Sequence, residues 1–287
     1  MNTGPSLKTL LRKGHLIVAP GIYDMVSMRL ADRMGFEALY MTGYGTVASH
    51  LGLPDAGLAS YADMLNRVQA ICGMATTPVV CDGDTGYGGL LNVAHTVRGY
   101  ERAGAAAIQL EDQEFPKKCG HTPGRRVIPM EDMVAKIRVA VEARTSSDFL
   151  IVARTDARTA LGLDEALRRA DAYGMAGADL LFVESPESEE EVARIGRSLE
   201  QPLLINLVES GRTPILPPDV LQEMGFSLAI YPAIGFLAAG QAMQTAYSHL
   251  RKTGTSMGVP VPLHDFMAFN EVMGFDAVWE FDKRHAR

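Results

Sequence analysis

Residues 103–112 read AGAAAIQLED, which is a glycine followed by a short apolar run that ends in two acids. The glycine fits the position just after a helix, and an apolar run of this length fits a buried strand. The same pattern recurs around Gly35, Gly177 and Gly225. The chain therefore repeats one unit, in which a helix ends at a glycine and a strand follows.

Eight apolar runs along the chain are expected to be strands. They are centred near Ile17, Leu39, Val80, Ile108, Ile151, Phe182, Leu204 and Ala229. Helical patterns such as 130–143 and 163–175 lie between them, and this alternation predicts a parallel sheet that is buried on both faces. Eight units in about 250 residues fit a (β/α)8 TIM barrel, and we prefer it to an open doubly wound sheet because no Gly-x-Gly-x-x-Gly opens a helix after the first strand.

The barrel domain is expected to span residues 1–287, with residues 255–287 as a helical extension of it. This extension lies beyond what eight units need, and it carries the apolar residues Phe266 and Trp279. An apolar helix without a partner would expose a patch, so we expect the extension to dock on another subunit.

The composition limits the class of protein and its partners. The chain has 287 residues, of which 47% are hydrophobic and 21% charged, as in an ordinary globular protein. A net charge of −7 without a basic stripe argues against a nucleic-acid partner. The three cysteines have no framework spacing, and we find neither an apolar signal core nor a run of about 18 apolar residues. We therefore expect a cytoplasmic protein with reduced thiols and no membrane partner.

Polar residues follow most of the expected strands, at the edge where a barrel builds its active site. They are Thr42, Gly43 and Tyr44, then Asp82 and Asp84, then Glu111, Arg154, Glu184 and Asn206. Carboxylates with few histidines nearby favour Mg2+ or Mn2+ over zinc. An alternative for Asp82 and Asp84 is a simple turn, Glu184 could instead cap the next helix, and Tyr40 could be a core aromatic of its strand.

The motif Lys117-Lys118-Cys119-Gly120-His121 lies in a loop flanked by glycine and proline. Lysines next to a cysteine favour its thiolate, and a histidine can exchange a proton with it. Cys119 could therefore be a nucleophile or a proton donor and acceptor. The motif alone leaves a buried thiol at a turn as an alternative.

Together these segments resemble the isocitrate lyase and phosphoenolpyruvate mutase superfamily over essentially the whole chain. The matching segments are Tyr40–Gly43, Gly52–Asp55, Asp82–Gly88, Glu111–Gln113, Lys117–His121, Ala153–Asp156 and Asn206. The most specific is Lys117–His121, which marks the carbon–carbon lyase branch with the 2-methylisocitrate lyases and 2,3-dimethylmalate lyases. The turn Thr42–Gly45 departs from the Ser-Gly-Gly-Gly of 2-methylisocitrate lyase, and residues 207–214 look closer to the dimethylmalate group.

The resemblance implies a barrel whose last helices are exchanged with a neighbouring subunit, in a homotetramer built as a dimer of dimers. It implies that Asp82 binds Mg2+ directly and that Asp55, Asp84 and Glu111 hold its water ligands. Thr42, Gly43, Tyr44 and Arg154 would bind the 2-oxo-acid half of a substrate. Gly120, His121, Glu184 and Asn206 would lie along the departing carboxylate.

The expected function is a Mg2+-dependent carbon–carbon lyase that cleaves a 2-hydroxy dicarboxylate, of the 2-alkylmalate or 2-methylisocitrate type, to a 2-oxo acid such as pyruvate plus a carboxylate. Cys119 would deliver the proton that quenches the leaving carbanion, with Lys117 setting its pKa, while Arg154 and His121 stabilise the developing charge. Tyr40, a hydroxide on the metal and Glu111 acting through water remain alternatives for the base.

Three other functions stay open at this point. One is an oxaloacetate hydrolase or decarboxylase with the same metal and oxo-acid pocket. Another is phosphorus–carbon chemistry like that of carboxyphosphonoenolpyruvate mutase. The third is a non-catalytic metabolite-binding barrel in which Cys119 is only a packing thiol.

Overall fold

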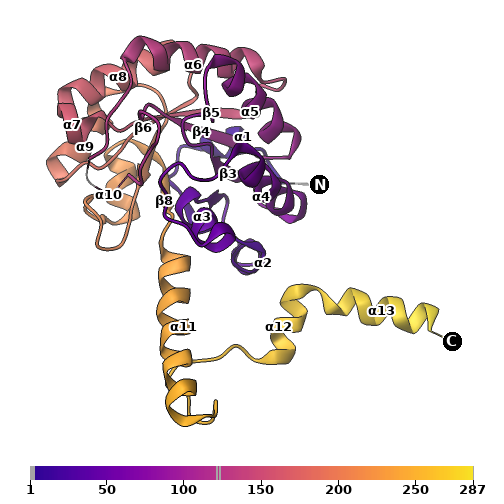
Figure 1. The fold of residues 1–287 in the computed structure, drawn as a ribbon. Helices are drawn as coiled ribbons and strands as arrows, with labels where there is room; N and C mark the ends of the chain where they lie inside the picture. The colour runs from indigo at the N-terminus through magenta and orange to yellow at the C-terminus, as the bar shows by residue number, and fades with distance from the viewer. Residues whose placement is uncertain (1–3, 121, 123, 287) are drawn as a thin grey trace. The chain divides into compact units, whose positions relative to one another are not determined.

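The computed structural model describes residues 4–120, 122 and 124–286. Eight parallel strands close into a barrel in the order in which they occur along the chain (Figure 1). They are β1 (Ile17–Ile22), β2 (Leu39–Met41), β3 (Val79–Asp82), β4 (Ala107–Glu111), β5 (Leu150–Thr155), β6 (Leu180–Val183), β7 (Leu203–Asn206) and β8 (Phe226–Tyr231). Every expected strand centre falls inside one of them, so the predicted (β/α)8 barrel is confirmed.

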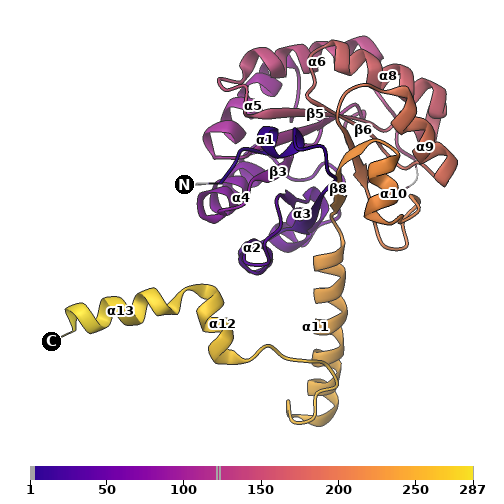
Figure 2. The same cartoon turned by 180° about the vertical axis from the view of Figure 1, so that it is seen from behind.

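Helices connect these strands and cover the outside of the barrel, as Figures 1 and 2 show for α5, α6 and α8. The helices up to β8 are α1 (Leu7–Leu11), α2 (Met25–Asp32), α3 (Gly43–Leu51), α4 (Tyr61–Met74), α5 (Leu90–Arg102), α6 (Met130–Ala143), α7 (Ala157–Leu161), α8 (Leu163–Met175), α9 (Glu189–Ser198) and α10 (Pro218–Glu223). The helices expected at 130–143 and 163–175 are α6 and α8.

Apolar side chains fill the barrel on both sides of its wall. One cluster occupies the interior and includes Val80, Leu150 and Leu228, and a larger cluster lies between the strands and the helices. Leu7 and Leu10 of α1 belong to the interior cluster, so α1 closes one end of the barrel (Figure 2). Since both faces of each strand are buried, the strands are almost continuously apolar and polar groups collect where the strands end.

The glycine of the repeated unit has a defined conformational role. Gly104 follows α5 with a φ of +93°, a left-handed conformation that side chains with a Cβ rarely adopt. The glycines at 35, 177 and 225 also have positive φ. The helix end that the sequence predicts at these positions is confirmed.

The strand register sets which side chains share a level at the carboxyl edge. β4 and β5 pair from Ala107 with Leu150 up to Glu111 with Arg154. On the other side of β4, Gln109 pairs with Asp82 at the end of β3. These pairings place Asp82 next to Gln109 and Glu111 next to Arg154 at the carboxyl edge.

The chain divides into two compact units, residues 1–234 and residues 235–287. The second unit contains most of α11 (Ile234–Thr253), then α12 (Phe266–Met273) and α13 (Phe275–His285), none of which buries a residue. The extension expected at 255–287 falls within this unit. Two statements about the extension stay predictions. One is that it belongs to a single barrel domain of residues 1–287, and the other is that it is exchanged between subunits.

Among the residues that the structure describes, no helix combines the length and the apolar character that a membrane span needs.

Candidate functional site

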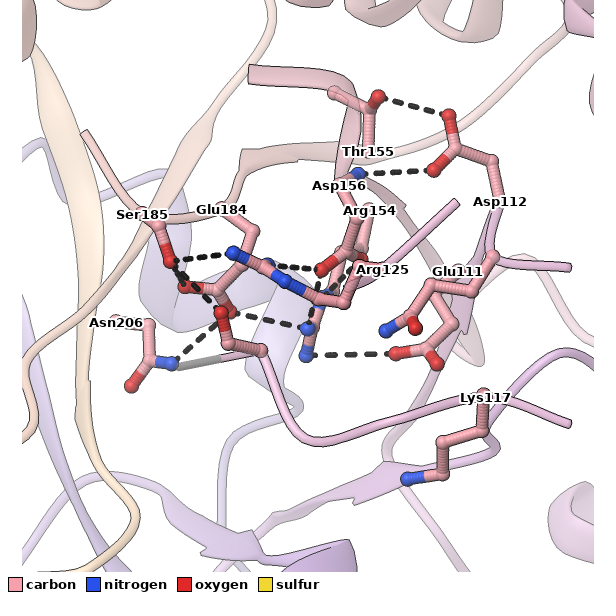
Figure 3. Close-up of polar contacts among 12 residues, drawn as sticks. Glu111, Asp112, Lys117, Arg125, Arg154, Thr155, Asp156, Glu184, Ser185 and Asn206 are labelled. Atoms are coloured by element: carbon pink, nitrogen blue, oxygen red, sulfur yellow. Dashed lines mark hydrogen bonds and ion pairs between the residues drawn. The ribbon is translucent and has the colours of Figure 1, made fainter. Parts of the chain in front are cut away.

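Arg154 is the centre of the polar groups at the carboxyl edge of the barrel (Figure 3). Its Nε and Nη2 donate to the two oxygens of Asp156, each over 2.9 Å. Nη1 lies 3.5 Å from Glu111 Oε2, and Nη2 lies 3.3 Å from Glu184 Oε2. Burial alone would lower the pKa of Arg154, but these carboxylates raise it well above its usual value. The guanidinium is therefore a permanent, oriented positive charge.

Glu184 and Asn206 continue this group around the barrel. Glu184 is fully buried at the end of β6, and its Oε2 accepts a 3.1 Å hydrogen bond from Asn206 Nδ2 at the end of β7. The hydroxyl of Ser185 donates to Glu184 Oε1 over 3.1 Å. Three neighbouring strand ends, those of β5, β6 and β7, thus contribute one connected set of side chains.

Lys117 lies among the acids that the sequence assigns to a metal site. Its Nζ is 2.5 Å from Asp55 Oδ1 and 2.5 Å from Asp84 Oδ1, with all three side chains buried. Burial would lower the pKa of Lys117, whereas Asp84, Asp55, Glu111 and Asp82 raise it well above the usual value. The sequence predicts that this ammonium sets the pKa of the Cys119 thiol. That role stays a prediction, and the contacts found for the ammonium are those with Asp55 and Asp84.

Two acids of this cluster, Asp84 and Glu111, have raised pKa values, and burial is the largest cause for both. Burial is the main reason that the pKa of Asp84 rises to about 7, with Asp82 and Asp55 raising it and Lys117 opposing them. Burial also raises the pKa of Glu111 well above its usual value, although Arg154 and Lys117 lower it. A carboxyl group whose pKa is close to neutrality can exchange protons during a reaction.

The donor atoms of the cluster suit a hard divalent cation. Asp82 Oδ1 accepts a hydrogen bond from the Asp84 amide over 3.0 Å. A Cβ added to Gly43 would lie only 2.6 Å from the other oxygen, Asp82 Oδ2. Glu111 Oε1 is buried without a hydrogen-bond partner among the described residues. Carboxylate oxygens of this kind are the usual ligands of Mg2+, although no three acids, cysteines or histidines in the described part already enclose a metal position.

Tyr40 has a core position inside the barrel. Its hydroxyl donates to Gln109 Oε1 over 3.0 Å, and its ring belongs to the interior apolar cluster. Burial, followed by the charge of Asp82, raises its pKa well above the usual value. Tyr40 is therefore a buried aromatic of the barrel interior, and its role as the catalytic base stays a prediction.

The segment that carries Cys119 connects the two halves of the site. The Cys119 amide donates to the Asp55 carbonyl over 3.2 Å, and its side chain is half-buried. The next residue, Gly120, accepts a 3.0 Å hydrogen bond from Ser185 Oγ through its carbonyl. Gly120 also packs so closely against Arg154 that an added Cβ would clash with Nη2. His121 lies outside the described residues.

The remaining predicted residues lie at the start of α3. Thr42 is the buried N-cap of α3, and its hydroxyl accepts a 3.5 Å hydrogen bond from the Gly45 amide. Gly43 is buried beside Asp82, while Tyr44 is 40% exposed. An exposed aromatic at this edge is available to contact a ligand.

Four residues of the site were not among the predicted site residues: Asp112, Arg125, Asp156 and Ser185. Asp112 accepts hydrogen bonds from Thr155 Oγ1 at 2.8 Å, Tyr173 at 2.8 Å and the Asp156 amide at 2.9 Å. Asp112 and Asp156 lie inside segments that carry the family resemblance, so the sequence held a signal for them. Arg125 and Ser185 lie in no such segment.

Comparisons with known proteins give matches over nearly the whole chain. The profile of a family described as phosphoenolpyruvate phosphomutase matches residues 7–251. A 2,3-dimethylmalate lyase of Eubacterium barkeri is 46% identical over 100% of this chain and 99% of that protein. A 2-methylisocitrate lyase of Aeropyrum pernix is 42% identical over 99% of this chain and 90% of that protein.

Solved structures give the same result. Oxaloacetate acetylhydrolase in complex with the inhibitor 3,3-difluorooxalacetate is 38% identical, with a TM-score of 0.92 over 97% of this chain and 95% of that one. Phosphonopyruvate hydrolase in complex with oxalate and Mg2+ is 29% identical, with a TM-score of 0.88 over 98% of both chains. The resemblance drawn from the sequence motifs is confirmed.

Proposed function

This chain belongs to the phosphoenolpyruvate mutase and isocitrate lyase superfamily, and from that premise we propose that it is a carbon–carbon lyase. Its substrate would be a 2-hydroxy dicarboxylate, with 2,3-dimethylmalate as the first candidate because the relative of that name is 46% identical over the whole chain. Cleavage between C2 and C3 of 2,3-dimethylmalate yields pyruvate and propanoate.

The observation that carries the proposal is the placement of residues 117–120. Lys117 lies among the acids that suit a cation, and Gly120 lies against Arg154 and Glu184. Cys119 therefore lies between two parts of the site. The acid cluster around Lys117 would bind the hydroxyl end of a substrate, and Arg154 would bind a carboxylate. A proton donor between these groups is what the cleavage of a 2-hydroxy dicarboxylate requires.

The residues of the site divide the reaction between them. Asp82 would hold Mg2+ directly, and Asp55, Asp84 and Glu111 would hold it through water; such an ion would supply a Lewis acid for the hydroxyl group of the substrate. Glu111 would take the hydroxyl proton through a water, since its buried Oε1 has no hydrogen-bond partner among the described residues and can accept from such a water. Arg154 would hold a carboxylate and stabilise negative charge as the C2–C3 bond breaks. The Cys119 thiol would then protonate the leaving carbon.

The finer features of the enzyme are also part of this proposal. We propose Mg2+ as the cofactor, with Mn2+ as its substitute, because phosphonopyruvate hydrolase, a structural neighbour of this chain, has been solved with Mg2+. We also propose a cytoplasmic homotetramer, in which the apolar helices of residues 235–287 contribute the contacts between subunits.

A second candidate is the hydrolysis of oxaloacetate to oxalate and acetate. The observation in its favour is the similarity to oxaloacetate acetylhydrolase, at a TM-score of 0.92 and 38% identity. The two reactions share an oxo-acid pocket, but hydrolysis needs a water at the carbonyl carbon. The identity with 2,3-dimethylmalate lyase is higher, so we place hydrolysis second.

The test is an assay of 2-oxo acid release with Mg2+ on a panel of substrates. The panel contains 2,3-dimethylmalate, 2-methylisocitrate, 2-ethylmalate, citramalate and oxaloacetate, and each reaction is repeated with EDTA. An EDTA-sensitive 2-oxo acid from one of the four hydroxy acids supports the lyase and identifies its substrate. Oxalate and acetate from oxaloacetate, with no product from the hydroxy acids, would establish the second candidate instead.

A further inference from the structure

Arg125 lies in the loop that carries Cys119, and the described residues at the base of this loop are paired. The Ile128 amide donates to the Asp112 carbonyl over 2.9 Å, and the Glu114 amide donates to the Arg126 carbonyl over 2.8 Å. Between these two bonds, Gln113 and Val127 form an antiparallel bridge. Arg125 is the first residue inside this paired base, so the base fixes its backbone.

The side chain of Arg125 turns inward, and the residue as a whole is 4% exposed (Figure 3). Its Nη1 lies 2.6 Å from Asp156 Oδ1, and neither side chain is accessible to solvent. Its Nη2 donates to Thr159 Oγ1 over 2.6 Å and lies 3.5 Å from Ser185 Oγ. The neighbouring Arg126 has the opposite environment, with a side chain that is 77% exposed and forms an ion pair with Glu114.

Asp156 connects Arg125 to the centre of the site. Its Oδ1 accepts hydrogen bonds both from Arg125 Nη1 and from Arg154 Nη2, and its Oδ2 accepts from Arg154 Nε. Arg154 donates to both oxygens of Asp156, and Arg125 adds a second donor at Oδ1 from the opposite guanidinium, so the two arginines together hold the buried carboxylate in one orientation. The direction in which Arg154 points therefore depends on Arg125.

We propose that Arg125 is a positioning residue, which acts through Asp156 to hold Arg154 in the orientation that binds the oxo-acid carboxylate. The inference rests on the proposed function for the role of Arg154. Because Arg125 belongs to the loop that carries Cys119, the same contact also connects Arg154 to that loop. Gly120, whose carbonyl accepts from Ser185 Oγ, is the second contact of this loop with the strand ends.

The experiment compares Arg125→Met and Arg125→Lys with Arg126→Met as the matched control. Oxalate is the probe, and its binding in the presence of Mg2+ is measured by titration calorimetry, together with kcat, KM and the unfolding temperature. Since a small misplacement of a binding group can cost orders of magnitude, we expect Arg125→Met to weaken oxalate binding by about tenfold or more and to lower kcat/KM similarly. Arg125→Lys should recover part of the affinity because it keeps a donor for Asp156, and Arg126→Met should match wild type.

Equal oxalate affinity in Arg125→Met and Arg126→Met would overturn the proposal, as would a loss that follows only the unfolding temperature. If Arg125→Met does not fold, an Arg125→Lys variant that binds oxalate and turns over like wild type would overturn it equally. The test is separable from the lyase reaction. A wild type that binds oxalate but cleaves no hydroxy acid refutes the lyase alone, whereas a wild type that binds no oxalate refutes the carboxylate-binding role of Arg154 and both proposals.

Discussion

The ammonium of Lys117 lies 2.5 Å from Oδ1 of Asp84, and both side chains are almost completely buried. Asp55 contacts the same ammonium, and Glu111 and Asp82 also raise its pKa. One lysine therefore balances several buried acids. Removing one member of a buried ion pair destabilises a protein strongly, because the other charge stays buried without compensation. The first two predictions follow from this relationship.

Replacing Lys117 with methionine should destabilise the protein when no divalent cation is added. The change leaves buried acids without their cation, and we expect a loss of about 3–5 kcal/mol in the free energy of unfolding. Added Mg2+ should raise the unfolding temperature of the variant more than that of wild type, because the ion restores positive charge among the acids. Urea and thermal unfolding measure both effects. Lys118→Met is the control, since Lys118 is exposed, and equal stability of the two variants would refute the role of Lys117.

The raised pKa of Asp84 predicts how stability depends on pH. Its pKa is about 7 in the folded protein and 3.8 as its ordinary value, so between these values the folded state binds the extra proton. The contribution of Asp84 to the free energy of unfolding is therefore largest below about pH 4. It falls as the pH rises toward 7, by at most about 1.4 kcal/mol per pH unit. The measurement is the free energy of unfolding of wild type minus that of Asp84→Asn at pH 5, 6 and 7 without metal. A difference that stays constant or rises with pH would contradict the shift.

Cys119→Ser separates a catalytic thiol from a packing thiol. If the thiol donates the proton, the variant should lose about 100-fold or more in kcat. Its affinity for oxalate in the presence of Mg2+ should stay close to that of wild type, because neither Arg154 nor the acid cluster is changed. Cys72→Ser is the matched control, since Cys72 is also half-buried but lies in α4. Normal turnover by Cys119→Ser would show that the Cys119 thiol is not the proton donor.

The fold was predictable because its signals are local and repeated. The glycine at four of the helix ends and the apolar run after it are short-range features, and together they predicted a strand near Ile108, which is β4 (Ala107–Glu111). The positions of most strand-end side chains were predictable for the same reason, because all parallel strands of a closed barrel end at the same edge. The register that pairs Glu111 with Arg154 follows from this arrangement.

The contacts of the loop were not predictable, because they join residues that no periodic pattern relates. Lys117 and Asp55 are 62 positions apart, and Arg125 and Asp156 are 31 apart. The sequence placed Lys117 beside Cys119, where proximity along the chain suggested an effect on the thiol. In the folded protein the ammonium of Lys117 contacts Asp55 and Asp84, and only long-range packing could bring these groups together.

The contact between Gly43 and Asp82 gives the most direct test of the metal site. A Cβ at position 43 would lie 2.6 Å from Asp82 Oδ2, so Gly43→Ala must move the carboxylate that is expected to bind Mg2+ directly. We expect the Mg2+ dissociation constant, measured by titration calorimetry, to rise about tenfold or more, since hard cations tolerate little displacement of a ligand. Gly73→Ala is the control, because a Cβ at that helical position meets nothing within 4 Å and should stabilise the protein by up to about 1 kcal/mol. If both variants bind Mg2+ as tightly as wild type, Asp82 is not the direct ligand, and the cation must be held elsewhere in the acid cluster.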